Sequence, residues 1–274
     1  MKNQGKGVFM YRYSVGIVTY NSKNEIGRLL SQLTSFFSPE ECQVVILDNC
    51  STDGTAEWIE QHYPTVTVLH SKENKGFGHG HNQIIQKIDS QYHAIVNPDI
   101  SIREDSIPKL CEYLDNHPEA VMVTPQILNE DGTEQFLPKR RPKIRYLMGG
   151  RLEKLGGPFP KWRAEYTMKD EKLTEPTPID FCTGCFSVIR TDILKKLGGF
   201  DDDFFMYFED ADLTRRAQKY GEVLFCPFTS VTHLWERASS KSFHFLKIQI
   251  SSMFLYFKKW RNDRQRASLP SNKN

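Results

Sequence analysis

The feature that most constrains the fold is the alternation of short β-branched runs with helical patterns over residues 13–99. Each run is too short to be a helix, and apolar residues at helical spacing or a glycine-rich turn follow it. Strands that alternate with helices predict a mostly parallel sheet with helices on both faces. The expected strands are residues 15–19, 44–47, 66–69 and 92–96, and the expected helices are 26–37, 55–63 and a third from the glycine-rich turn 75–80 to about residue 88.

Polar side chains stand at or just after the ends of three of these strands, namely Thr19, Asp48 and Asp99. In an open α/β sheet, ligands bind outside the carboxyl ends of the strands. The three strand ends are therefore expected to face one crevice. The first half of the chain is expected to bind a nucleotide.

After Asp99 the regular alternation stops, which indicates that the second half supplies the site for a second substrate. Pro138 to Arg163 is rich in Lys, Arg, Gly and Pro, and this composition predicts a mobile basic loop. A later strand is expected over 186–189, with helices over 191–197 and 209–220. The expected division is a flexible leader (1–12), one α/β domain (13–235, with halves 13–99 and 100–235) and a C-terminal segment (236–274).

Composition narrows the class of protein. The formal net charge of +2 predicts no general attraction to nucleic acid. The six cysteines have no regular spacing, which indicates reduced thiols, and the single CxxC at Cys182 to Cys185 favours small residues around a tight site over a metal or redox pair. No apolar run reaches the roughly 18 residues that span a bilayer, and the N-terminus lacks a signal peptide's apolar core. A cytoplasmic protein is expected.

Two loops carry features suited to a nucleotide. The run Asp48 to Thr55 begins with a carboxylate at a strand end, which can accept hydrogen bonds from a base or ribose. The alternative is a turn that caps the next helix. In the run Glu73 to Asn82, glycines let the backbone approach a phosphate, and the helix behind them presents its positive end. A plain tight turn is the alternative there.

Two acidic motifs suggest a metal ligand and a general base. Asp99 in Asn97-Pro98-Asp99 can hold Mg²⁺ or Mn²⁺ against a diphosphate, because hard cations prefer oxygen ligands. The acids of Glu209 to Asp212 begin a helix and favour its dipole, but adjacent carboxylates also raise each other's proton affinity, which suits a base. Arg215 and Arg216 on the same helix are partners for a phosphate or for these acids.

Six motifs follow one another in order: Val18-Thr19-Tyr20-Asn21, Asp48 to Thr55, Asn74 to Asn82, Asn97-Pro98-Asp99, Gly199-Phe200-Asp201 and Glu209-Asp210-x-Asp212. This series resembles the inverting family-2 glycosyltransferases of the GT-A fold, and most of all the bacterial rhamnosyltransferase branch. The resemblance runs from about Tyr13 to His233. Several motifs in one order are far more specific than any one of them.

The resemblance implies a role for each matching residue. Asp210 matches the catalytic base, with Glu209 beside it. Asp99 matches the last acid of the family's DxD metal motif, and His233 matches a histidine that completes metal binding in some relatives. Asn97 stands where many relatives have the first Asp. The residues expected to line the nucleotide-sugar pocket are Thr19, Tyr20, Asn21, Asp48, Asn49, Asn74, Gly76, Phe77, Gly78, Asn82 and Asn97, and those expected to face the acceptor or pyrophosphate are Gly184, Arg215 and Arg216.

The resemblance also implies a single inverting displacement. Asp210 would take the proton of an acceptor hydroxyl as that hydroxyl attacks the anomeric carbon, and a Mg²⁺ or Mn²⁺ on Asp99 would neutralise the leaving diphosphate. The favoured reaction moves L-rhamnose from dTDP-β-L-rhamnose to a lipid-linked or oligosaccharide acceptor in cell-surface polysaccharide synthesis. A UDP-hexose donor and a non-catalytic glycan-binding protein are the alternatives. A nucleotidyltransferase would need a glycine-rich, basic loop after the first strand, and Thr19 to Ser22 is not one.

The C-terminal segment has a bias of its own. Residues 241–266 contain seven basic residues and one acid. Apolar residues recur at helical spacing among them, which predicts a basic amphipathic helix. Its apolar face can pack on the catalytic domain, on a second subunit of a homodimer, or on the inner face of the cell membrane. The apolar residues are Phe243, Leu246, Ile250, Met253, Phe254 and Phe257.

Overall fold

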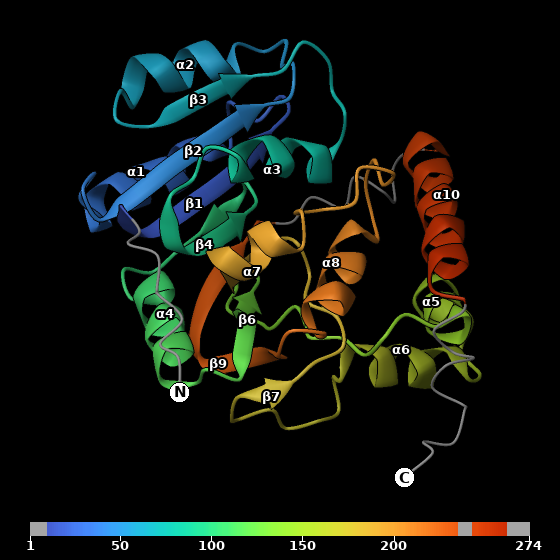
Figure 1. Cartoon of the computed structure of the whole chain (residues 1–274). Coiled ribbons are helices and arrows are strands. Elements are labelled where there is room, and N and C mark those ends of the chain that lie inside the picture. Colours follow the sequence, from blue (N-terminus) through green and yellow to red (C-terminus); the bar gives the residue numbers. More distant parts are fainter. Residues whose placement is uncertain (1–9, 235–242, 262–274) are drawn as a thin grey trace, which may run out of the picture.

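The computed structural model describes residues 10–234 and 243–261 (Figure 1). The leader expected over residues 1–12 lies mostly outside these ranges, and so does the tail from residue 262 onward. The first half alternates strands with helices, as the sequence predicts. Its elements are β1 (Tyr11–Thr19), α1 (Ile26–Phe36), β2 (Cys42–Asp48), α2 (Thr55–His62), β3 (Thr67–His70), α3 (Phe77–Ile85) and β4 (Ser90–Val96).

The second half is less regular and contains several short elements. Its strands are β5 (Ile100–Ser101), β6 (Ala120–Leu128), β7 (Thr177–Pro178), β8 (Phe186–Arg190) and β9 (Glu222–His233). Its helices are α4 (Ser106–Asn116), α5 (Ile144–Leu152), the 3₁₀ turn η1 (Glu153–Leu155), α6 (Phe159–Thr167), α7 (Thr191–Lys196), α8 (Glu209–Ala217) and α10 (Phe243–Lys259).

The strands form one mixed nine-stranded sheet in the order β3-β2-β1-β4-β8-β6-β9-β5, with β7 paired to β9. The four strands of the first half are parallel, which confirms the predicted parallel sheet there. Strand β8 then inserts antiparallel between β4 and β6, and β6 and β9 are again parallel. The second half therefore extends the same sheet and does not form a separate core.

Helices cover both faces of this sheet. On one face, a large apolar cluster joins α1, α2 and α4 to alternate residues of the strands, such as Val15 and Ile17 of β1. On the other face, α3, α7 and α8 pack through residues that include Ile85, Leu194 and Leu213. Successive strand residues point to opposite faces, so Val15 and Ile17 share one face of β1, and Ser14 and Val18 share the other. The buried Ser14 hydroxyl is satisfied there by hydrogen bonds to Ser90 (2.6 Å) and His93 (2.8 Å).

The prediction of a mobile basic loop over residues 138–163 is wrong. Helices α5 and α6 form a hairpin within this range (Figure 1). Tyr146 and Tyr166 are buried in it and stack with ring centres 5.3 Å apart. Part of the composition that suggested a loop belongs to the connection between the helices, since Gly156 and Gly157 have positive φ and Pro158 is the N-cap of α6. Gly149 lies inside α5, where a Cβ would come within 2.9 Å of α6.

The predicted C-terminal helix is present as α10, and it packs on its own domain next to α5 (Figure 1). Tyr256 and Trp260 are buried against the domain, whereas Ile250 and Phe254 are exposed. Apolar side chains thus lie on both sides of α10, so the helix lacks the single apolar face that was expected. None of the helices in the described ranges has the length and apolar character needed to cross a membrane.

Candidate active site

The carboxyl ends of β1 and β2 lie side by side, because Thr19 and Asp48 are paired in the parallel register. The Thr19 hydroxyl donates a hydrogen bond to Asp48 (2.9 Å), and the Ser51 hydroxyl and backbone N–H donate to the two Asp48 oxygens (2.6 and 2.9 Å). Both Thr19 and Asp48 are buried. Asp48 therefore organises the turn after β2. Its contact with a nucleotide stays a prediction.

Three asparagines join the neighbouring loops. Asn21 accepts a hydrogen bond from the Thr52 N–H (2.8 Å), and Asn49 donates from its amide to Asn74 (2.9 Å) and to the Gly76 carbonyl (3.1 Å). The structure thus brings the predicted residues of β1, β2 and the glycine-rich turn to one edge of the sheet. Tyr20 is exposed there, with 52% of its surface accessible.

The glycines after Asn74 allow a close approach between two chain segments. A Cβ on Gly76 would lie 2.0 Å from the Phe205 carbonyl oxygen, and Gly76 has φ +93°. The next residue, Phe77, donates its N–H to the same oxygen (3.1 Å). A Cβ on Gly78 would lie 2.9 Å from the Phe200 Cβ. The turn therefore packs against the segment that leads to Asp210.

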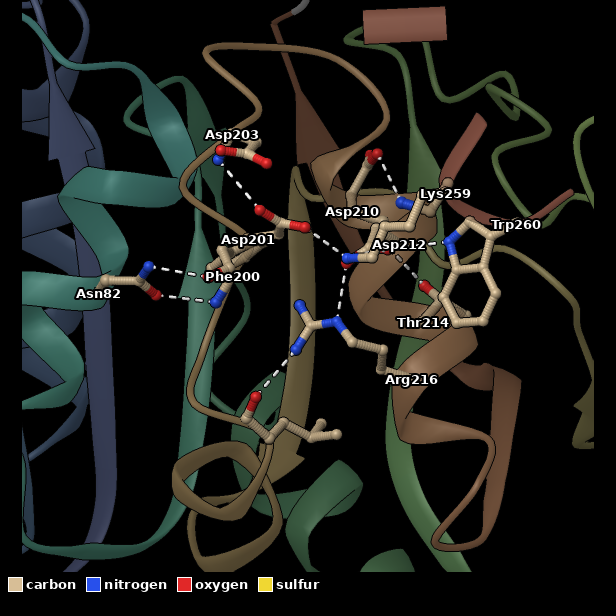
Figure 2. Close-up of polar contacts among 12 residues, drawn as sticks. Asn82, Phe200, Asp201, Asp203, Asp210, Asp212, Thr214, Arg216, Lys259 and Trp260 are labelled. Atoms are coloured by element: carbon tan, nitrogen blue, oxygen red, sulfur yellow. Dashed lines mark hydrogen bonds and ion pairs between the residues drawn. The ribbon is translucent and has the colours of Figure 1, made fainter. Parts of the chain in front are cut away.

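Asn82 of α3 fastens the same segment. Its side-chain oxygen accepts from the Phe200 N–H (2.8 Å) and its amide donates to the Phe200 carbonyl (2.9 Å), as Figure 2 shows. The amide also donates to Asp202 (2.8 Å). Asn82, predicted in the nucleotide-sugar pocket, thus has a clear structural role between the two halves of the domain.

Asp99 and His233 are brought together by the pairing of β5 with β9. His233 Nε2 lies 3.2 Å from Asp99 Oδ2, and His233 Nδ1 lies 3.1 Å from the Gln135 side-chain oxygen. Gln135 also donates to the His233 carbonyl (2.8 Å), so it fixes the ring orientation. Nearby, the Asn97 N–H donates to the Cys185 carbonyl (2.9 Å) and holds the turn after β4.

The chemistry of the Asp99 and His233 pair fits a divalent cation. One carboxylate oxygen and one imidazole nitrogen converge from two elements, and each side chain is partly or fully sheltered, with 21% and 6% exposed. In the described ranges, no group of three or more His, Cys, Asp or Glu side chains gathers as a metal site. Such a pair suits Mg²⁺ or Mn²⁺, which take one or two protein ligands and complete their shell with water and substrate phosphates.

Asp210 lies at the start of α8, opposite the segment before β8. Its two oxygens accept hydrogen bonds from the Gly184 N–H (3.0 Å) and the Ala211 N–H (2.9 Å). Burial raises the pKa of Asp210, while the charge of Lys139 lowers it. Burial, together with the charge of Asp210, raises the pKa of Glu209 well above its usual value. The two N–H donors favour the ionised form of Asp210, which suits a general base. The role of Asp210 as the base stays a prediction.

The remaining predicted residues of this region lie around α8. A Cβ on Gly184 would meet Phe77 at 3.2 Å, so these two residues line the same space beside Asp210. Arg216 donates to Asp212 (2.7 Å) and to a backbone carbonyl, and Arg215 lies 4.1 Å from a Trp260 ring centre. Arg215 therefore contacts α10, and Arg216 joins α8 to the end of α7 at Leu197. Their contact with phosphate stays a prediction.

Sequence reasoning missed four side chains that shape this site. Gln135 orients His233, and Lys139 lies near Asp210. Lys259 and Trp260 of α10 both contact Asp212, as Figure 2 shows. None of these residues lies in a recognisable motif. Only the basic character of the C-terminal segment drew attention to Lys259, and nothing drew attention to Trp260.

A mixed α/β sheet with Asp99 and His233 at its strand ends, and a partly buried Asp210 at the start of the helix opposite, is the arrangement of a glycosyltransferase of the GT-A fold. The chain belongs to glycosyl transferase family 2, whose model matches residues 14–198. The match ends before the segment that carries Asp210, so the role of that residue rests on its geometry and on the resemblance of its motif.

Curated relatives are similar over most of the chain. The N-acetylglucosaminyl-diphospho-decaprenol L-rhamnosyltransferase of Mycobacterium tuberculosis is 30% identical over 232 residues, which cover 79% of this chain and 74% of the relative. The rhamnosyltransferase WbbL of Escherichia coli K12 is 24% identical over 218 residues, 75% of this chain and 76% of the relative. These relatives span the two halves of the domain.

Solved structures share the fold at low identity. TarS 1–349 of Staphylococcus aureus superposes with a TM-score of 0.59 at 16% identity, over 95% of this chain and 76% of that one. The Pyrobaculum calidifontis mannosyltransferase PcManGT, in complex with GDP-Man and Mn²⁺, gives a TM-score of 0.56 at 18% identity, over 90% of this chain and 63% of that one. Of a longer TarS structure, this chain covers 37%.

Proposed function

We propose that this glycosyltransferase moves L-rhamnose from dTDP-β-L-rhamnose to a glycan acceptor, with inversion at the anomeric carbon. The observation that carries the choice of sugar is the 30% identity, over 79% of the chain, to a rhamnosyltransferase that acts on N-acetylglucosaminyl-diphospho-decaprenol. By analogy, the acceptor is a lipid-linked or oligosaccharide glycan of cell-wall or other cell-surface polysaccharide synthesis.

The residues of the site support the following division of work. The edge formed by Thr19, Asp48 and Asn49 receives the nucleotide. Asp210, held by two backbone N–H groups, accepts the proton of the acceptor hydroxyl as the new glycosidic bond forms. Burial and the charge of Asp210 raise the pKa of Glu209, which favours a protonated Glu209 beside an ionised Asp210. The bond from the anomeric carbon to the donor phosphate breaks on the opposite face, and the nucleoside diphosphate leaves.

Asp99 and His233 would hold a Mg²⁺ or Mn²⁺ ion. When bound, the ion supplies positive charge to the donor diphosphate. Gln135 keeps the His233 Nε2 directed at Asp99, and the pairing of β5 with β9 keeps the two ligands in register. These residues bind and orient. Proton transfer is assigned to Asp210.

A UDP-hexose or UDP-N-acetylhexosamine donor is the second candidate. It is favoured by the similarity to the poly(ribitol-phosphate) β-N-acetylglucosaminyltransferase TarS, which is 25% identical over 148 residues, 52% of this chain. A TarS structure in complex with UDP-GlcNAc shares the fold, with a TM-score of 0.52. The two candidate donors differ in their nucleobase and in their sugar. The residues expected to distinguish the nucleobases are those at the edge around Tyr20 and Asn21.

The location follows from the proposed acceptor. A lipid-linked glycan would bring the protein to the inner face of the cell membrane as a cytoplasmic, peripheral enzyme. The exposed residues Lys247, Phe254 and Lys258 of α10 combine apolar and basic character, which suits an anionic lipid surface. A homodimer through the same side of α10 is the alternative use of these residues.

Thermal unfolding with dTDP, UDP and their sugars, each with Mg²⁺, Mn²⁺ or a chelator, tests the donor. A ligand that binds only the folded state raises the melting temperature. We expect the largest metal-dependent rise with dTDP-rhamnose, and a larger rise with UDP-sugars would favour the second candidate. Asp210→Asn should keep the donor shift and lose transfer. Undiminished transfer by that variant would refute the assignment of the base.

A further inference from the structure

Lys139 lies between β6 and α5, against the segment that holds Asp210. Its carbonyl oxygen accepts hydrogen bonds from the N–H groups of Asp180 (3.1 Å) and Phe181 (3.0 Å). Its ammonium nitrogen lies 4.7 Å from the centre of the Phe181 ring. Gly184, three residues after Phe181, donates its N–H to Asp210. Lys139 is therefore part of the wall around the catalytic base.

The charge of Asp210 acts on the Lys139 ammonium and raises its pKa, but the two groups form no direct ion pair. Within the ranges that the structure describes, the ammonium forms no ion pair within 4.0 Å and donates no hydrogen bond. The Lys139 nitrogen also lies 5.9 Å from the ring centre of Tyr166, and Arg163 precedes Tyr166 by three residues, about one turn, on α6. The Arg163 side chain is half-buried and likewise forms no such contact among the described residues, and its charge lowers the pKa of Lys139. Burial lowers the pKa of Lys139 to about 8. Two neighbouring cations repel each other, and an anion bound between them would relieve the repulsion.

We propose that Lys139 and Arg163 form a subsite beside Asp210 for a phosphate group of one of the reactants. The inference deepens the proposed glycosyl transfer and rests on it. Ammonium and guanidinium groups bind phosphate oxygens through charge-assisted hydrogen bonds. The phosphate has two possible sources: the diphosphate of the nucleotide sugar, and a diphosphate that links an acceptor glycan to its lipid.

Calorimetric titration of the full chain tests the subsite and separates the two sources. The first probe is the nucleoside diphosphate that binds most tightly, and the second is inorganic pyrophosphate added to protein already saturated with that nucleotide. Lys139→Met removes the charge and Lys139→Arg keeps it. Lys143→Met is the matched control, because Lys143 is exposed and lies 5.5 Å from the Tyr146 ring centre.

Loss of a charge-assisted contact is expected to weaken binding about tenfold or more. If Lys139→Met weakens nucleotide binding and neither Lys139→Arg nor Lys143→Met does, the subsite holds the donor diphosphate. If nucleotide binding is unchanged but the additional pyrophosphate binding is lost, the subsite holds a phosphate of the acceptor. Unchanged binding of both probes overturns the proposal. If the unaltered protein binds no nucleotide at all, the proposed function fails and the subsite with it.

A second variant keeps the test valid if Lys139→Met does not fold. Arg163 is only half-buried and donates no hydrogen bond within the described part of the chain, so Arg163→Met should fold. It is expected to weaken the same probe as Lys139→Met, by a smaller factor. A folded Arg163→Met protein that binds both probes normally would overturn the two-cation subsite.

Discussion

Asp212 lies fully buried on α8 and joins that helix to α10 (Figure 2). Its oxygens contact Arg216 Nε (2.7 Å), Lys259 Nζ (2.8 Å) and the Trp260 indole N–H (2.9 Å). Removing the carboxylate charge leaves two cations without their shared anion, and Arg216 is only 16% exposed. Breaking a buried ion pair in this way costs about 3–5 kcal/mol. We therefore expect Asp212→Asn to destabilise the protein by that amount.

Lys259→Met is the milder test of the same contact. The Lys259 side chain is 30% exposed and also pairs with Asp201, while Asp212 keeps its two other partners. Solvent screening reduces the value of such a contact, so the expected loss is about 1–2 kcal/mol. At about 2–4 °C per kcal/mol, the melting temperature should fall by roughly 2–8 °C. Asp212→Asn should lower it by roughly 6–20 °C.

Urea unfolding of both variants, with Lys258→Met as the control, measures these losses. Lys258 is the exposed neighbour of Lys259 on α10, and its loss should change stability by no more than about 0.5 kcal/mol. The double variant Asp212→Asn with Lys259→Met should lose less than the sum of the single losses, because the two residues share one contact. If Lys259→Met is no less stable than Lys258→Met, or if the losses add fully, the reasoning is refuted.

Three further predictions concern titration and backbone strain. Burial lowers the pKa of His93 to about 3 from 6.5, so the free energy of unfolding should fall as the pH drops below about 6. In urea unfolding, His93→Asn should reduce the slope of this free energy against pH by up to about 1.4 kcal/mol per pH unit, and an unchanged slope would contradict this. The charge of Lys139 lowers the pKa of Asp210, so Lys139→Met should move the acid limb of the kcat profile to higher pH, and an unmoved limb would count against Asp210 as the base. Gly76→Ala should lower the free energy of unfolding by about 2–4 kcal/mol more than Gly132→Ala. Both glycines have positive φ, but only at Gly76 would a Cβ clash with a neighbour, since Gly132 has nothing within 4 Å of a Cβ. Equal losses of stability in urea unfolding would exclude the clash.

The parallel half of the sheet could be predicted because its signals are local. Strand periodicity and the polar residues after each strand are enough to place Thr19 and Asp48 at one edge, and the structure pairs them. The meeting of Asp99 with His233 is different. It depends on the pairing of β5 with β9, which no local pattern encodes, and only the resemblance to a family suggested it.

The errors have physical causes too. In residues 138–163, glycine and proline occur between the helices and also inside α5, and composition alone cannot separate such a helical hairpin from a loop. Lys139 lies in no recognisable motif. Its position near Asp210 depends on the pairing of its backbone with Phe181, and no local sequence pattern predicts that pairing. Packing on its own domain was one of three predicted possibilities for the apolar face of α10. The residues that hold α10 on the domain, such as Asp212, lie far from it in the sequence, so the sequence could not select among the three.

The turn that presents Asp210 explains why α10 is packed where it is. Tyr207 and Phe208 both have positive φ, at +69° and +68°, immediately before α8. The left-handed conformation costs about 1–2 kcal/mol for each residue other than glycine, so this turn needs support from its surroundings. Phe208 packs against Tyr256 of α10, with ring centres 5.5 Å apart, and the Ser252 hydroxyl donates to the Met206 carbonyl (2.7 Å). The C-terminal helix therefore holds the strained turn, and through it the position of Asp210, from outside the residues that the family model matches.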